Sequence, residues 1–144
     1  MGRVQNSVHI DRSAADVFAF VTDLANMPKW SSAVLRSSVS EAPIRVGTTF
    51  QTTGKLMGRT IRLEGRVIEH QPDRRFATKA LEPYPLTVTW TFEPEDGGTR
   101  VVRTGDLETT GLLALLSPIT RRLAWRADQT SLEKMKALLE ARTP

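Results

Sequence analysis

Residues 117–142 constrain the fold more than any other stretch, because their pattern predicts one long helix. Ser117 can accept a hydrogen bond from the free N–H groups of a first helical turn, and Pro118 suits the first helical position, which needs no N–H donor. A helix from Pro118 to Arg142 has about 25 residues and spans about 37 Å, enough to cross a small domain. The rest of the chain must therefore close around this helix.

The predicted helix carries two apolar stripes at helical spacing. The first stripe comprises Ile119, Leu123, Ala127, Thr130 and Leu138, with Leu116 just ahead of it. The second stripe, rotated from the first, comprises Leu132, Met135 and Leu139. Such a broad apolar surface needs a concave partner, and a curved antiparallel sheet is the natural one. We therefore expect the helix to lie across the concave face of a sheet.

Length and composition indicate one globular domain. The 144 residues fit a single domain, 1–144, which can bury about two-thirds of its unfolded surface. Hydrophobic residues make up 40% and charged residues 25%, which is typical of a globular chain and excludes a disordered one. The absence of Cys excludes disulfides and thiolate chemistry.

Charge and hydropathy bear on location and partners. The N-terminal residues lack the apolar core of a signal peptide, and no 18-residue apolar run occurs, so we expect a cytoplasmic protein without integral membrane association. The net charge is +4, but basic and acidic side chains are mixed along the chain. Because no basic motif interleaved with aromatic residues accompanies the charge, we expect no nucleic-acid binding.

The first 30 residues predict a strand and two short helices. Arg3–Ile10 alternates like a half-buried strand, which turns His9 outward. Ser13 and Asp16 then form a capping-box pattern ahead of apolar residues at helical spacing, and a further turn ends at Trp30.

Beyond Trp30 the hydrophobic period changes from 3.6 to 2 for some 75 residues, with turn signals at the intervals of an antiparallel meander. The expected strands cover residues 33–39, 50–56, 61–67, 76–80, 88–92 and 99–107. With the first strand this makes seven strands, two short helices between the first and second strands, and one long C-terminal helix. The fold class is therefore α+β.

Four local sequence patterns, in this order and spacing, resemble the START-like (SRPBCC) superfamily, which includes the birch-pollen-allergen fold and the bacterial polyketide cyclase/dehydrase group. They are Val-His-Ile-Asp-Arg-Ser-Ala-Ala-Asp-Val-Phe at 8–18, Asp-Leu-Ala-Asn-Met-Pro-Lys-Trp at 23–30, Val-Gly-Thr-Thr-Phe at 46–50, and Phe-Glu-Pro at 92–94 followed by Gly-Thr-Arg-Val at 98–101. The resemblance implies a helix-grip fold, in which a curved seven-stranded sheet wraps the C-terminal helix around an apolar cavity. Members bind lipids, polyketides, steroids or other hydrophobic molecules, and only some are enzymes. The resemblance supplies no fixed catalytic motif.

The sequence contains almost no group of residues that is typical of a catalytic, metal-binding or phosphate-binding site. The two His residues, His9 on the outer face and His70 beside the turn at Pro72, support neither a Ser-His-Asp arrangement nor a His-based metal site. The Gly residues stand mostly singly at turns, so no phosphate-binding loop is present. We expect no metal and no other cofactor.

The inward face mixes small and polar residues with apolar ones, as in a pocket that holds a ligand. Gly54 and Gly65 either leave volume for a ligand or let the sheet bend. Trp90 and Trp125 are either core residues or ligand contacts, and Tyr84 is either a gate or part of a surface loop. The candidate ligand-binding residues are Phe50, Thr52, Gly54, Leu63, Gly65, Val67, Phe76, Thr78, Tyr84, Val88, Trp90, Arg103, Ile119, Leu123 and Ala127.

Arg103 is the single residue that most strongly indicates a function. An inward guanidinium must be paired, reach the cavity mouth, or meet an anionic ligand group. A bulge would instead turn Arg103 outward and bring Val102 inside. Glu69 continues the inward parity of Val67 and could pair with Arg103. If the cavity is catalytic, Arg103 would stabilise an oxyanion and Glu69 would be the base.

Residues 109–116 should form a separate turn or short helix, because Pro118 cannot continue a helix that passes through it. Their side chains Leu112, Leu113, Leu115 and Leu116 either plug the end of the grip or remain exposed as a lid or a homodimer patch. The preferred hypothesis is a protein that binds a small hydrophobic ligand of the polyketide, lipid or terpenoid type. The alternatives are a polyketide cyclase/dehydratase-type enzyme and a structural or interaction protein that binds no ligand.

Overall fold

The computed structural model describes residues 2–31, 33–56, 58–82, 85–107 and 118–142. Seven strands form one antiparallel sheet in the order β1-β7-β6-β5-β4-β3-β2. The strands are β1 (Gly2–Ile10), β2 (Val34–Val39), β3 (Thr49–Leu56), β4 (Arg59–Gln71), β5 (Arg75–Glu82), β6 (Leu86–Glu95) and β7 (Gly98–Leu107). The helices are α1 (Ala14–Thr22), the 3-10 turn η1 (Leu24–Asn26), α2 (Met27–Trp30) and α3 (Pro118–Glu140). This architecture confirms the predicted α+β helix-grip class.

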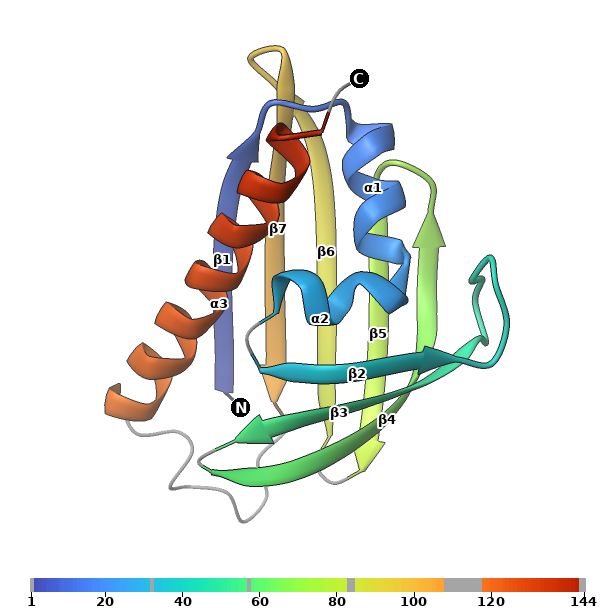
Figure 1. Cartoon of the computed structure of the whole chain (residues 1–144), viewed down its shortest axis with the longest axis vertical. Coiled ribbons are helices and arrows are strands. Elements are labelled where there is room, and N and C mark those ends of the chain that lie inside the picture. The colour runs from blue at the N-terminus through green and yellow to red at the C-terminus, as the bar shows by residue number, and fades with distance from the viewer. Residues whose placement is uncertain (1, 32, 57, 83–84, 108–117, 143–144) are drawn as a thin grey trace.

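The sheet bends strongly along β4. Figure 1 shows β1, β7, β6 and β5 upright, whereas β2 and β3 run across them below α2. The pairing of β4 with β5 contains two register shifts, one between Glu64 and Gly65 and one between Val67 and Glu69. Each extra residue kinks its strand and increases the twist. The bend gives the sheet the concave face that holds the core.

The N-terminal elements follow the predicted patterns. In β1, Asn6, Val8 and Ile10 are buried. The Ser13 side chain accepts a hydrogen bond from the Asp16 N–H at 3.2 Å and so caps α1. The core then gathers apolar side chains from α1, α2, the concave face of the sheet and the C-terminal half of α3.

Helix α3 packs on β1 and α2 mainly with its second apolar stripe, together with the partly buried Leu138 of the first stripe. Leu132, Met135 and Leu139 are at most 1% exposed. The first stripe was also expected to face the sheet, but Ile119, Leu123, Ala127 and Thr130 are exposed, so that prediction is wrong. At 100° per residue the two stripes point about 150° apart, and one helix cannot press both against the same sheet. Ser117, the predicted cap, lies outside the described residues.

The same helix covers the edge of the sheet at β1, as Figure 1 shows. Trp125 Nε1, Gln129 Nε2 and Lys136 Nζ donate to the backbone carbonyls of alternate residues of the strand. The acceptors are Gln5 at 3.1 Å, Ser7 at 3.2 Å and His9 at 2.6 Å. These bonds satisfy carbonyls that an edge strand would otherwise leave open to another chain. Trp125 is thus a half-exposed edge contact and not a core residue.

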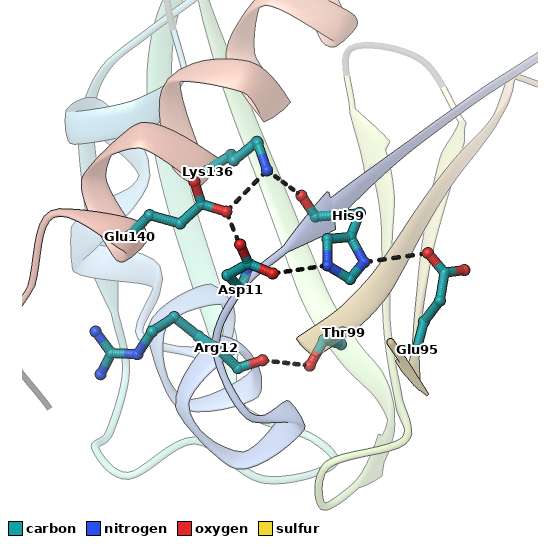
Figure 2. Close-up of polar contacts among 7 residues, drawn as sticks. All are labelled: His9, Asp11, Arg12, Glu95, Thr99, Lys136 and Glu140. Carbon is teal, nitrogen blue, oxygen red and sulfur yellow. Dashed lines mark hydrogen bonds and ion pairs between the residues drawn. The ribbon is translucent and has the colours of Figure 1, made fainter. Parts of the chain in front are cut away.

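A polar network holds the end of α3 against the end of β1 (Figure 2). Arg12 Nη1 donates to the carbonyl of Leu139 at 2.9 Å, which also accepts from the Arg142 N–H, and to the carbonyl of Arg142 just beyond the helix at 2.8 Å. The Arg12 side chain thus bonds carbonyls at the C-terminal end of the helix, where intrahelical donors are lacking. Thr99 Oγ1 donates to the Arg12 carbonyl at 2.7 Å, and the Glu140 carboxylate accepts from Lys136 Nζ at 2.8 Å and from the Asp11 N–H at 2.9 Å. The C-terminal half of α3 is therefore fixed in place.

Candidate functional site

A cavity of about 180 Å³ lies between the concave face of the sheet and the helices. Four buried aromatic side chains from α2, β3, β5 and β6 form much of its wall, namely Trp30, Phe50, Phe76 and Trp90. Helix α3 contributes only Asp128 and Ser131 among the described lining residues. The wall is thus mainly apolar, with a few polar groups on the side of α3.

Eight of the predicted ligand-binding residues line this cavity: Phe50, Thr52, Leu63, Phe76, Thr78, Val88, Trp90 and Arg103. Val67 is fully buried in the core and is not part of the lining. Tyr84 lies outside the described residues. Ile119, Leu123 and Ala127 are exposed on the far side of α3, so their expected position in the cavity wall is wrong.

The two strand glycines allow close packing and do not line the cavity. A Cβ on Gly54 would overlap the carbonyl oxygen of Ala33 on the neighbouring segment. A Cβ on Gly65 would lie 2.6 Å from Phe50 Cζ and 3.1 Å from the Lys79 carbonyl oxygen. Both positions therefore need Gly because other atoms approach closely, and Gly65 also lies at one of the register shifts at which the sheet bends.

Arg103 faces inward from β7, as predicted. Its strand pairs with β1 and β6 without a register shift, which excludes the bulge that would have turned Val102 inside. Nη1 donates to Asp128 Oδ2 on α3 at 3.0 Å, and the guanidinium carbon lies 5.7 Å from the centre of the Trp90 ring. The side chains of Arg103 and Asp128 are 20% and 29% exposed. The cavity therefore contains a partly buried ion pair.

Glu69 does not belong to the site, so its expected inward position is wrong. The register shift between Val67 and Glu69 reverses the parity of β4. Glu69 accepts hydrogen bonds from Arg75 Nε at 3.0 Å and Gln71 Nε2 at 2.9 Å. His70 turns inward instead, and its ring meets Phe18 edge-on at 5.2 Å. No pattern in the sequence marks that bulge.

Asp128 is the main functional candidate that the sequence analysis missed. A signal was present, because Asp128 continues the buried stripe of Leu132, Met135 and Leu139 toward the N-terminus of the helix. The other lining residues not singled out are Val21, Leu24, Met27, Trp30, Ser31, Ala33, Val34, Ala80, Leu86 and Ser131. Six of these ten lie between Leu24 and Val34, in η1, α2 and the connection to the start of β2.

A second, wider cleft of about 570 Å³ lies over β2–β5. It is open to solvent, and Glu64, Arg66 and Lys79 are among its lining residues. Because the cleft is more exposed to solvent than the cavity, it is a weaker candidate for an apolar ligand. Within the described ranges, no three His, Asp or Glu side chains come together as a metal site. None of the described helices is both long and apolar enough to span a bilayer.

Comparison with solved structures supports the fold. The protein TTHA0849 from Thermus thermophilus matches with a TM-score of 0.83 and 22% identity over 99% of this chain and 100% of that one. A START superfamily protein from Mycobacterium smegmatis matches with a TM-score of 0.81 and 14% identity over 98% and 99%. The di-domain ARO/CYC protein BexL from the BE-7585A biosynthetic pathway has a TM-score of 0.72 and 22% identity, over 99% of this chain and 51% of BexL. At these identities the likeness concerns the fold alone.

No curated protein sequence matches the chain. The family described as polyketide cyclase/dehydrase and lipid transport matches residues 1–140, nearly the whole chain. The match agrees with the curved sheet, the C-terminal helix and the apolar cavity between them. The chain therefore belongs to the polyketide cyclase/dehydrase and lipid transport family.

Proposed function

We propose that this protein binds one small hydrophobic molecule in the cavity between the sheet and the helices. The observation that carries the proposal is the cavity itself, whose described wall combines Trp30, Phe50, Phe76 and Trp90 with the Arg103–Asp128 ion pair. A small number of polar groups in an apolar wall is typical of a site that orients a ligand. Aromatic rings supply most of the contact area.

The size of the cavity restricts the ligand. Drug-sized ligands occupy pockets of about 300–1,000 Å³, whereas an apolar cavity of about 150 Å³ holds benzene. The present cavity of about 180 Å³ therefore suits a compound of one or two rings, or an equivalent terpenoid or acyl fragment. A long-chain lipid would have to displace wall residues.

Arg103 is expected to orient the ligand. Its Nη1 is bonded to Asp128, and a guanidinium has further N–H donors that can meet a ligand carbonyl or carboxylate. A small polyketide or terpenoid with an oxygen at one end fits such a wall. The family description, which joins polyketide cyclases with lipid transport, agrees with this ligand class.

The experiment is denaturing extraction of the purified protein followed by mass spectrometry, together with a panel of apolar dyes, short-chain fatty acids and terpenoids. Thr78 lines the cavity, so Thr78→Phe should fill it and abolish the rise in melting temperature that a bound probe causes. Thr60→Phe, at an exposed position of β4, is the matched control and should bind as the native protein does. Empty extracts and no response to any probe would instead favour a structural or interaction role.

The second candidate function is catalysis in the same cavity, of the polyketide cyclase/dehydratase type. The specific observation is the carboxylate of Asp128, 3.0 Å from Arg103. In an enolisation, Asp128 would take the proton next to a substrate carbonyl and Arg103 would donate to the enolate oxygen. Asp128 replaces Glu69 in this role, because Glu69 pairs with Arg75 outside the cavity.

Carrier and enzyme differ in the response of three variants. For an enzyme, Arg103→Met and Asp128→Asn should slow turnover of a β-ketone substrate far more than they weaken its binding, whereas Glu69→Gln should leave both unchanged. For a carrier, the native protein should return the compound unaltered and the first two variants should lose affinity only. Equal turnover by all four proteins would exclude both residues from the chemistry.

A further inference from the structure

The outer side of the first half of α3 is an exposed surface that combines apolar and cationic side chains. Ile119, Leu123 and Trp125 are 74%, 62% and 45% exposed. Arg122 and Arg126 lie on the same side of the helix as Ile119 and Leu123 and are also exposed, whereas Trp125 borders this side and donates from Nε1 to the Gln5 carbonyl of β1. These five residues are named the α3 outer surface. Exposed apolar side chains that are bordered by polar or charged ones often mark a surface that binds another molecule.

The charge of this surface has one sign. No acidic residue occurs between Pro118 and Asp128, and Asp128 turns inward to Arg103. Beside the surface, Arg3, Arg121, Arg122 and Arg126 line a groove of about 480 Å³ together with Trp125. Arg3 pairs with Asp106, while Arg122 and Arg126 have no ion-pair partner in the part of the chain that the structure describes. The groove and the surface thus present net positive charge around exposed apolar groups.

We propose that the α3 outer surface docks the protein on an anionic lipid bilayer. Ile119 and Leu123 would enter the boundary between headgroups and acyl chains, and Arg122 and Arg126 would meet the lipid phosphates. Trp125 would lie at the headgroup level, where an indole ring is favoured. Amphipathic helices with Lys or Arg beside apolar residues bind membrane surfaces in this way. Positive charge within a Debye length of anionic lipid adds to the attraction.

The fold lets α3 dock without leaving the sheet. Leu132, Met135 and Leu139 stay buried on the opposite side of the helix, and Trp125, Gln129 and Lys136 remain bonded to β1. Docking therefore needs no unfolding and no separation of α3 from the core. The inference is independent of what the cavity binds, because none of the five surface residues lines the cavity.

Other partners fit the surface less well. In a symmetric dimer this surface would meet a second copy of itself, which would gather the Arg122 and Arg126 side chains of both copies without an acidic partner on the surface, and like charges repel. A nucleic acid would use the Arg residues but would leave Ile119 and Leu123 exposed to water. A bilayer satisfies both kinds of side chain.

The test is flotation of the purified protein with phosphatidylcholine vesicles that contain about one-third phosphatidylglycerol, and with pure phosphatidylcholine vesicles. We expect binding to the anionic vesicles, little binding to the neutral ones, and loss of binding in high salt because salt screens the attraction. Trp30 and Trp90 are only 4% exposed. A blue shift of tryptophan fluorescence on vesicle binding should therefore report Trp125 and disappear in Trp125→Phe.

Two double variants test whether vesicle binding depends on the Arg residues of the α3 outer surface or on the net charge of the whole protein. Arg122→Glu with Arg126→Glu should reduce the vesicle partition coefficient at least about tenfold. The control, Arg59→Glu with Arg62→Glu on β4, changes the net charge equally at exposed positions and should bind as the native protein does. Ile119→Ser with Leu123→Ser should also weaken binding, because the insertion of apolar groups is lost. Unchanged melting temperatures would show that all variants fold.

Three outcomes would overturn the proposal. The first is no binding to anionic vesicles, or equal loss in the β4 control. The second is Arg122- and Arg126-dependent retention of double-stranded DNA without vesicle binding, which would assign the surface to nucleic acid. The third is a concentration-dependent dimer in sedimentation that Leu123→Ser abolishes while vesicle binding is absent, which would assign the surface to a second copy.

Discussion

Arg103 on β7 and Asp128 on α3 form a 3.0 Å ion pair that joins the sheet to the C-terminal helix at the wall of the cavity. The same guanidinium lies over Trp90, with its carbon 5.7 Å from the ring centre. The pair therefore serves two purposes, because it places a donor in an apolar wall and fixes α3 at the position where its buried half begins.

The two partners of this ion pair should be energetically coupled. Arg103→Met or Asp128→Ala alone leaves a partly buried charge without its partner, so each should lower the free energy of unfolding by about 1–3 kcal/mol. The double variant should cost less than the sum of the two. Urea denaturation checks this, with the exposed pair Arg45–Glu41 as a control whose coupling should be weaker because solvent screens it. Equal coupling in the two pairs would contradict the structural role of the cavity pair.

Gly65→Ala should destabilise the protein although both residues are small. The new Cβ would lie 2.6 Å from Phe50 Cζ, so the ring must move, at a cost of about 1–3 kcal/mol. The matched control is Gly105→Ala, whose Cβ would meet nothing nearer than Arg103 Nη1 at 3.7 Å. Thermal unfolding should show a lower melting temperature for the first variant and an unchanged or higher one for the second. The reverse order would show that Phe50 does not pack on Gly65.

Two leucines of α3 should respond differently to truncation. Leu132 is fully buried, so Leu132→Ala should cost about 2–5 kcal/mol of unfolding free energy. Leu123 is 62% exposed, so Leu123→Ala should change it by less than about 0.5 kcal/mol. Chemical denaturation of both variants measures the difference. A similar cost at both positions would mean that the outer stripe is also covered.

Stability should fall on the alkaline side as His9 loses its proton. A hydrogen bond to Asp11 raises the pKa of His9 above its ordinary 6.5, burial partly opposes this, and Glu95 adds to the increase. Figure 2 shows one ring nitrogen toward each carboxylate, at 2.9 Å for Asp11 and 3.1 Å for Glu95, and only the imidazolium can donate to both. The other charged groups around the ring are Lys136, Arg100 and Glu133.

Because the pKa of His9 is raised in the folded state, its stabilising contribution is complete below pH 6.5 and is lost as the pH rises through the folded pKa. The unfolding free energy of the native protein should therefore decrease relative to His9→Gln between about pH 6 and 8. The carboxylates of Glu41 and Glu140 stay ionised above pH 6, because hydrogen bonds from Arg45 and Lys136 lower their pKa values from 4.5. They therefore do not contribute to the pH dependence in this range. Parallel pH profiles for the two proteins would contradict the assignment.

The local patterns determined the elements of this protein. The alternation of Val8 and Ile10 in the first strand, the cap at Ser13 and the helical period after Pro118 depend on neighbours in sequence, and each element formed where its pattern predicted. Strict alternation also determined that Arg103 faces inward, because β7 pairs without a bulge. For the same reason, eight of the expected ligand-binding residues line the cavity.

Tertiary structure decided the features that depend on distant segments. The bulge before Glu69 arises in the pairing of β4 with β5 and reverses the side-chain parity, so the strand pattern alone placed Glu69 on the wrong face. Leu132 is buried and Leu123 is exposed because of the way in which α3 lies against β1. Asp128 became the partner of Arg103, 25 residues away, only through that orientation. Periodicity shows which residues share a face of an element, whereas the contacts between elements determine what that face meets.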